Sequence, residues 1–164
     1  MCGYIFKLEN SCTVTGRKDL VIIFSEKFPE DYLADKTLVG LSGASLQNAL
    51  KKPFILTKKL DVEIKFEGAE YLFTIPENYD WNGANVPPCC WIVIGQAKEP
   101  RFKLASMVHD YICEHKEVIN YSRYLSTLVF EALCEYFGRF NAIKRWMMFH
   151  SVDNFQKLQN WNHR

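Results

Sequence analysis

The chain has 164 residues, of which 48% are hydrophobic and 15% aromatic, and this composition excludes a disordered chain. Its 20 basic and 19 acidic residues leave a net charge of +1, which excludes the broad basic surface of a nucleic-acid-binding protein. Uninterrupted apolar runs span only a few residues, so no membrane insertion is expected. We predict a single domain over residues 1–164.

The first part of the chain, residues 1–75, is predicted to be mostly β. Apolar and charged residues alternate in "LDVEIKF", which is typical of a half-buried strand. The turn-like "EGAE" follows, so this run and the next form a predicted hairpin. A brief helix is expected at 42–52, with Ser42 or Ser45 near its cap and Pro53 past its end. The predicted strands are 4–8, 20–24, 54–56, 60–66 and 70–75.

The second part is predicted to be helical. Residues 76–99 form an irregular crossing, because Asn-Gly and two prolines in "WNGANVPP" are turn residues. Three helices follow between residues 100 and 161, with Gly138 as a stop and Asn141 as a cap. The fold class is therefore α+β, with a small antiparallel sheet packed on three C-terminal helices. The predicted helices are about 100–115, 121–137 and 141–161.

Each predicted helix has an apolar face expected to point inward. For the third helix, an alternative is a partner surface, if Trp146, Met148, Phe149 and Trp161 are exposed. The inward faces are Leu104, Val108, Tyr111 and Ile112 on the first helix, Tyr121, Leu125, Leu128, Ala132 and Tyr136 on the second, and Ile143, Trp146, Met147, His150, Val152 and Phe155 on the third.

Three segments, "TIPENYDWNGANVPPCCW" (74–91), "KLASMVHDYICE" (103–114) and "SRYLSTLVFEAL" (122–133), together resemble a phage and prophage family known as domain of unknown function 1353. The resemblance covers about residues 53–150. It implies a phage origin and this fold, but it supplies no reaction. The positions that follow the family pattern in order are Ile75, Pro76, Tyr79, Ala84, Val86, Pro87, Ala105, His109, Asp110, Tyr111, Arg123 and Phe130.

The chain also departs from the family pattern. Asn82 and Thr127 replace two aspartates, so two positions that could ionise are neutral here. If the family uses those positions for acid–base chemistry or metal binding, we expect this member to have lost it. The other departures are Asn78 for Gly, Trp81 for Thr and Asn85 for Ser.

His109 and Asp110 have two competing interpretations. As a hydrolytic dyad they need a carboxylate to orient the imidazole, and Glu131 is the candidate on the second helix. Glu131 could equally pair with Arg123, which lies on the same face of the second helix. We favour the structural interpretation, in which His109 and Asp110 hold the "DWNGANVP" loop against the helices by hydrogen bonds. The predicted loop-holding residues are Asn82, Asn85, Trp81, Tyr111, Arg123 and Thr127.

The cysteines allow a zinc site or a disulfide. His109 and Cys113 have the i, i+4 spacing of metal ligands on a helix, and Cys89-Cys90 precede them. Cys89 could instead bridge to Cys113. We expect neither, and no cofactor, because spaced cysteine pairs are missing and "MCGYIFKLENSC" lacks the apolar core of an export signal. The expected alternative is reduced, buried thiols at Cys90, Cys113 and Cys134.

From these observations we expect a non-enzymatic phage protein, a small virion component of the head–tail or tail region, or an assembly component. It would act through contacts with other phage proteins, in the virion or the host cytoplasm, and an assembly would allow it to form oligomers. One alternative is a hydrolase of the lysis or entry stage that uses His109 and Asp110. A second is a host-directed inhibitor protein.

Overall fold

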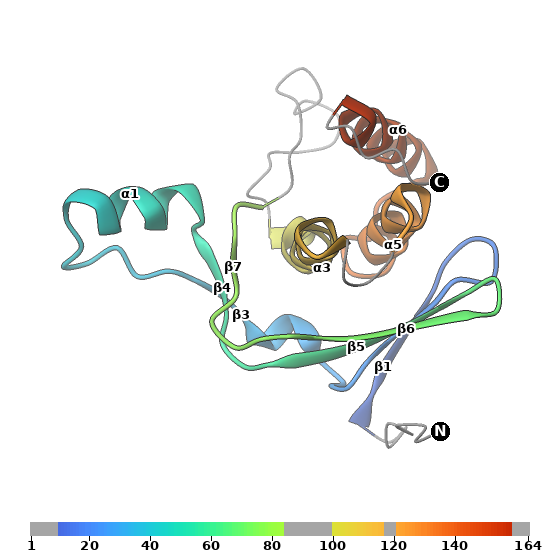
Figure 1. Cartoon of the computed structure of the whole chain (residues 1–164), viewed down its shortest axis with the longest axis horizontal. Helices are drawn as coiled ribbons and strands as arrows, with labels where there is room; N and C mark the ends of the chain where they lie inside the picture. The colour runs from blue at the N-terminus through green and yellow to red at the C-terminus, as the bar shows by residue number, and fades with distance from the viewer. Residues whose placement is uncertain (1–9, 84–99, 117–120, 159–164) are drawn as a thin grey trace.

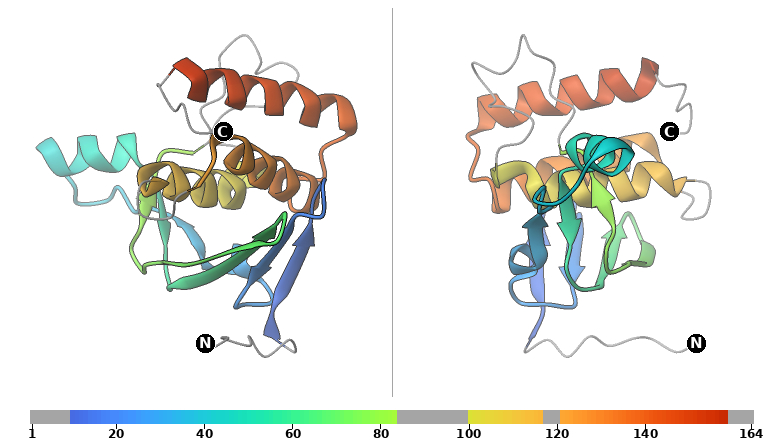
Figure 2. Two further views of the ribbon diagram at one scale, coloured as in Figure 1. Left: turned by 45° about the vertical axis from the view of Figure 1, so that its right-hand side comes forward. Right: turned by 90° about the vertical axis from the view of Figure 1, so that its left-hand side faces the viewer.

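The computed structural model describes residues 10–83, 100–116 and 121–158. The body has three layers: β-strands on one side, helices α3 (Lys103–Glu114) and α5 (Arg123–Tyr136) in the middle, and α6 (Ala142–Leu158) outermost (Figures 1 and 2). The α+β class and the three packed C-terminal helices confirm the prediction. In the described part of the chain, no helix is long and apolar enough to cross a membrane.

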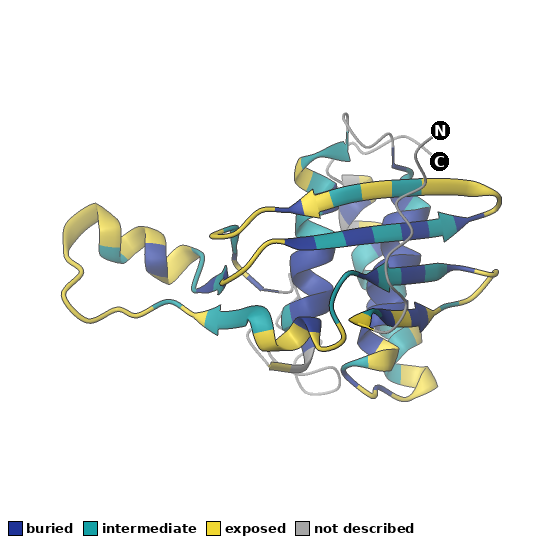
Figure 3. Ribbon diagram, turned by 90° about the horizontal axis from the view of Figure 1, so that it is seen from below, coloured by how far each residue is buried: buried dark blue, intermediate teal, exposed yellow. Residues whose placement is uncertain are grey.

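The larger sheet has four antiparallel strands in the order β1-β2-β5-β6. The predicted hairpin is confirmed, and its two-residue turn places Glu67 and Gly68 at positive φ, as a type I′ turn requires. Every second residue of β5 is buried against α3 and α5, because side chains alternate across a strand (Figure 3). The strands are β1 (Cys12–Thr15), β2 (Val21–Phe24), β5 (Leu60–Phe66) and β6 (Ala69–Ile75).

A second sheet of three strands accompanies the four-stranded one, where we had predicted a single sheet. Its order is β3-β4-β7, and all pairs are antiparallel. Strand β7 lies inside the segment predicted to be irregular, where Trp81 pairs with Phe54. Two residues are too few for a periodic signal, so their strand character comes from the partner strand. The bounds are β3 (Leu33–Asp35), β4 (Phe54–Leu56) and β7 (Asp80–Trp81), and the 3₁₀ turn η2 (Pro29–Tyr32) precedes β3.

The helices begin and end close to the predicted bounds. Ser122 caps α5 by accepting a hydrogen bond from the Leu125 N–H at 3.1 Å. Asn141 caps α6, as predicted, by accepting one from the Lys144 N–H at 3.0 Å. Gly138 follows α5, where a Cβ would lie 2.6 Å from the Cys134 carbonyl oxygen. The short 3₁₀ turn η4 (Pro100–Phe102) leads into α3.

The predicted inward faces are wrong for parts of α5 and α6. Tyr136 is 53% exposed at the end of α5, and Ile143 and Trp146 are 71% and 62% exposed on α6. His150 is also exposed, whereas Met148 is buried. Because α6 is the outermost layer, one side faces α5 and the other faces solvent, and apolar residues lie on both sides. The spacing of apolar residues along α6 therefore does not predict which side of the helix packs on α5.

A projecting arm, residues 36–53, extends from the three-stranded sheet and carries helix α1 (Gly43–Lys51) (Figures 1 and 3). The helix confirms the one predicted at 42–52. Ion pairs fix the base of the arm, since Lys36 lies 2.5 Å and Lys52 3.3 Å from Asp80 of β7. Beyond this base, most of the arm is exposed to solvent.

Candidate functional site

Polar side chains from all three helices meet in one place. His109 and Cys113 come from α3, Ser126 and Thr127 from α5, and Gln156 from α6. We call these five residues the polar cluster. The i, i+4 spacing puts His109 and Cys113 on one face of α3, toward α5 and α6. The cluster lies beside the apolar core that the three helices share.

Gln156 is the centre of the polar cluster. Its amide nitrogen lies 2.7 Å from His109 Nε2 and donates to Ser126 Oγ at 2.9 Å, while its amide oxygen accepts from Thr127 Oγ1 at 3.0 Å. Ser126 Oγ in turn donates to the Arg123 carbonyl at 2.8 Å. Every polar group of the buried amide is therefore paired, which offsets the cost of burying it.

Cys113 is the member of the polar cluster that also lines a small cavity. Its Sγ lies 3.7 Å from each ring nitrogen of His109 and 3.6 Å from the Gln156 amide nitrogen. The sulfur also lines a cavity of about 170 Å³, whose other walls are Lys52, Trp81, Asn82, Asp110 and Glu114. The His109 side chain, which is not part of the cavity wall, extends from α3 toward Gln156 of α6.

The charges around His109 favour its protonated form. Burial opposes a charged imidazole, but Cys113 and the Asp110 carboxylate, with Oδ1 3.6 Å from His109 Nδ1, outweigh burial and raise the pKa of His109 to about 10. A charged ring donates from both nitrogens, so the Gln156 amide would then turn to present its oxygen to Nε2. The two hydroxyls of the cluster can donate or accept, so they fit either orientation.

Asp110 itself is disfavoured as a charged group. Burial, and then the neighbouring Glu114 carboxylate, raise the pKa of Asp110, although His109 and Lys52 act in the opposite direction. Glu114 accepts a hydrogen bond from the Tyr79 hydroxyl at 3.0 Å, and burial raises the pKa of Tyr79. The cavity is therefore surrounded by several ionisable groups whose charges depend on one another.

Glu131, the candidate acid of the dyad interpretation, binds neither His109 nor Arg123. Its carboxylate lies 2.6 Å from Arg17 Nη2, so it pairs with the loop between β1 and β2 instead of orienting His109. Arg123 does not pair with Glu131 either, because its guanidinium binds Asp153 of α6. Both buried charges are thereby neutralised by partners that the spacing along α5 does not reveal.

The predicted loop-holding residues have separate surroundings. Trp81 is buried and donates from Nε1 to Ser106 Oγ at 3.1 Å. Tyr111 donates from its hydroxyl to the Thr74 carbonyl at 2.9 Å, which ties α3 to β6. Asn82 is exposed at the rim of the cavity. Asn85 lies outside the described residues.

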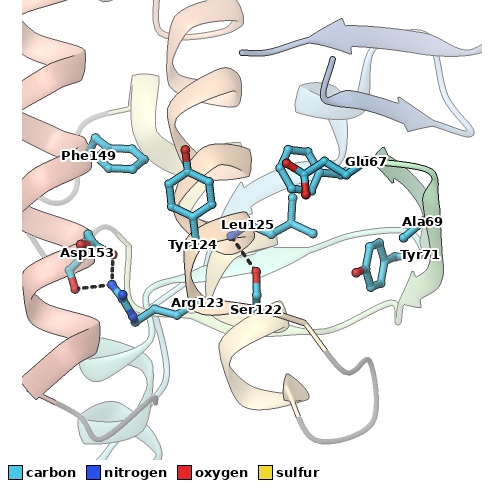
Figure 4. A pocket seen from close by; sticks show the side chains of 10 residues that line it. Glu67, Ala69, Tyr71, Ser122, Arg123, Tyr124, Leu125, Phe149 and Asp153 are labelled. Atoms are coloured by element: carbon cyan, nitrogen blue, oxygen red, sulfur yellow. Dashed lines mark hydrogen bonds and ion pairs between the residues drawn. The ribbon is translucent and has the colours of Figure 1, made fainter. Parts of the chain in front are cut away.

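An open groove of about 610 Å³ lies between the β5–β6 hairpin and helices α5 and α6 (Figure 4). Tyr71 forms one wall, and Tyr124 and Phe149 line the other side. Its charged residues include Arg123 and Asp153, which bind each other at the groove. The groove therefore offers aromatic side chains, the paired Arg123 and Asp153, and the Glu67 carboxylate from the hairpin turn.

The metal and disulfide alternatives involve some residues that the structure describes and some that it does not. Among residues 10–83, 100–116 and 121–158, no three His, Cys, Asp or Glu side chains gather as metal ligands would. Cys12, Cys113 and Cys134 are free thiols, and Cys12 and Cys134 are buried while Cys113 is half-buried. Cys89 and Cys90, which both alternatives need, lie outside the described residues.

The fold and the polar cluster define a small α+β protein whose three packed helices enclose a histidine, a thiol and an amide. The sequence model of the family described as "Protein of unknown function (DUF1353)" matches residues 58–152, more than half of the chain, and the chain belongs to this family. No curated protein and no solved structure was found to match it. The resemblance inferred from the sequence is therefore confirmed.

Proposed function

We propose that this protein is a phage-encoded component of a virion, or of its assembly, and that it acts through contacts between proteins rather than by catalysis. The phage origin rests on the family resemblance. The observation that carries the proposal is the projecting arm, which presents apolar side chains to solvent.

The arm is poorly covered by its own chain. Val39 is 88% exposed, Leu50 50% and Leu38 43%, whereas Ala49 is the buried residue of α1. A helix of nine residues gains little stability by itself in water, and its conformation depends on packing. Exposed apolar residues gathered on one projecting element are typical of a contact site. We infer that a partner covers the arm.

The charge of the arm indicates the kind of partner surface. Residues 36–53 contain three lysines and no acidic residue. Asp80 binds two of them, Lys36 and Lys52, whereas Lys51 is exposed. A partner surface with carboxylates around an apolar patch would complement this arrangement.

A second apolar surface lies on α6, in the outermost layer of helices. Ile143 and Trp146 are exposed there, and the Trp146 ring lies 4.5 Å from that of His150. Large aromatic side chains are over-represented among residues that dominate binding energy. Two contact surfaces on separate elements suit a component that touches two neighbours in an assembly.

The hydrolase alternative has one observation in its favour, the contact between His109 and Cys113. Its predicted third member, Glu131, binds Arg17. The inhibitor alternative also uses protein contacts, so the identity of the partner distinguishes it from a particle component.

Site-specific photocrosslinking during phage production tests the proposal. A photoreactive phenylalanine analogue at position 39, on the arm, should crosslink to another protein of the particle. The same analogue at position 70, exposed at the far end of the β5–β6 hairpin, is the matched control and should not give that product. A crosslink from position 39 to a host protein would support the inhibitor instead, and no crosslink from either position would contradict the proposal.

A further inference from the structure

We propose that Cys113 is a nucleophilic thiol paired with His109, and that the adjoining cavity admits a small, uncharged electrophile to it. The cavity adjoins the base of the projecting arm through Lys52, but the proposal does not depend on the proposed contact function.

The geometry brings a base to the thiol. Cys113 Sγ lies 3.7 Å from both Nδ1 and Nε2 of His109, so the imidazole lies against the sulfur, and as an imidazolium it holds the thiol proton and stabilises the thiolate. The thiolate that remains is the reactive form of cysteine. Gln156 holds the imidazole in place from α6, with its amide nitrogen 2.7 Å from Nε2. A nucleophile, a base and an orienting group are thus present together.

The cavity provides access to the sulfur and limits what can enter. Its volume of about 170 Å³ is below the 300–1,000 Å³ of pockets for drug-sized ligands, so only a small molecule or the end of a longer one fits. Trp81 gives the cavity an apolar wall. A small electrophile there would lie against the indole ring and next to Cys113.

The charged groups around the cavity disfavour anions. Asp110 and Glu114 of α3 line it, together with Lys52 from the base of the arm. The Lys52 ammonium is already engaged, 3.3 Å from Asp80 and 3.6 Å from Glu114. The Tyr79 hydroxyl donates to Glu114 from the strand side. With two carboxyls against one paired ammonium, an uncharged electrophile is favoured over an anionic one.

The chemical step is a substitution at carbon. The Cys113 thiolate forms a bond to the electrophilic carbon, and the bond to the leaving group breaks with its electron pair. His109 holds the proton that it took from the thiol and can return it to the leaving group. No electron is gained or lost overall, so no redox partner is needed. An alkyl or acyl carbon with a good leaving group is the class of substrate.

The other described thiols provide internal controls. Burial raises the pKa of Cys134 well above its usual range and also raises the pKa of Cys12. Neither residue lines the cavity beside His109. In the folded protein we therefore expect both to react far more slowly than Cys113.

Site-resolved alkylation tests the proposal in the intact chain. The protein is treated at pH 7 with uncharged iodoacetamide or anionic iodoacetate, and peptide mass spectrometry follows each cysteine separately. Cys113 should react with iodoacetamide faster in the folded protein than in urea-unfolded protein, although folding half-buries it. It should also prefer iodoacetamide over iodoacetate at least tenfold more strongly when folded than when unfolded. Slower reaction of folded Cys113 with iodoacetamide would overturn the proposal.

Two substitutions assign the effect to residues. His109→Gln should lower the iodoacetamide rate of Cys113 about tenfold or more, because the base is lost. Asp110→Asn should raise the iodoacetate rate selectively, because a carboxylate leaves the rim. An unchanged Cys113 rate in folded His109→Gln protein would overturn the pairing. If His109→Gln does not fold, two results still test the proposal. They are the Cys113 alkylation rate of the folded parent against that of the unfolded parent, and the iodoacetate rate of Asp110→Asn.

Discussion

Gln156 Nε2 and His109 Nε2 lie 2.7 Å apart and join the first and last of the three C-terminal helices. They are separated by 47 positions in the sequence. The same amide contacts Ser126 and Thr127, so one side chain links α6 to both α3 and α5. We infer that this residue fixes the position of α6 on the other two helices.

Replacing Gln156 by leucine should therefore destabilise the fold. The change leaves the Thr127 hydroxyl and the His109 ring without the buried partner that they have now. Removing one partner of a buried hydrogen bond costs about 1–3 kcal/mol, so we expect a loss of that size in the free energy of unfolding. Chemical denaturation measures it. Asn154→Leu, on an exposed position of the same helix, is the control and should change stability by less than about 0.5 kcal/mol. Equal effects of the two changes would refute the linking role.

The two described tryptophans should respond very differently to the same substitution. Trp81 is 1% exposed, packs beside Phe54 at a ring distance of 5.6 Å, and donates to Ser106. Trp81→Ala should cost about 3–5 kcal/mol through the cavity it leaves. Trp146 is 62% exposed, so Trp146→Ala should stay within about 0.5 kcal/mol of the parent. Thermal or urea unfolding of both variants checks this, and a large loss for Trp146→Ala would show that α6 packs elsewhere.

Stability should depend on pH through His109. The usual pKa of 6.5 is raised to about 10 in the fold, so the folded state holds the proton more tightly than the unfolded state. The stability from this charge is fully present below pH 6.5 and is lost as pH rises through about 10. The difference in unfolding free energy between the parent and His109→Gln should shrink from pH 6 to pH 10 by at least about 1.4 kcal/mol, the value of one pKa unit. A difference that grows with pH would show a neutral His109.

The parts of the fold that follow a strong local period were predictable. The alternation in Leu60–Phe66 and the turn at Glu67–Gly68 specify the hairpin, and caps such as Asn141 mark helix starts. Strands β1, β3 and β7 have two to four residues each, and β3 and β7 also depend on a strand distant in sequence, β4. So short a run carries no period of its own.

The candidate site was only half predictable. His109 and Asp110 were found from their place in the family pattern, and Thr127 from its departure. Gln156 gave no signal, because a glutamine on a helix is usually solvated, and its burial depends on how α6 crosses α3 and α5. The ion pair between Glu131 and Arg17 was not predicted, because Arg17 comes from a loop more than a hundred residues earlier. Helix spacing reports neighbours on the same helix, not those across an interface.

The exposed side chains of the arm should matter little for folding. Leu38, Val39 and Leu50 have few contacts to lose, so replacing all three by serine should change the unfolding free energy by no more than about 0.5 kcal/mol per site. Denaturant unfolding measures this. A matched variant with Gln47 and Asn48 replaced by serine alters exposed polar residues of the same helix. A large loss of stability in the triple variant alone would show that the arm packs on its own chain.

The most direct test of the central claim is the amount of this protein in purified phage particles and assembly intermediates, measured by quantitative mass spectrometry. We predict that the parent and the Gln47–Asn48 control are present at equal, stoichiometric levels, and that the triple arm variant is folded but lost from the particles. Absence of the parent from particles and intermediates, or retention of the triple variant at the parental level, would contradict the claim.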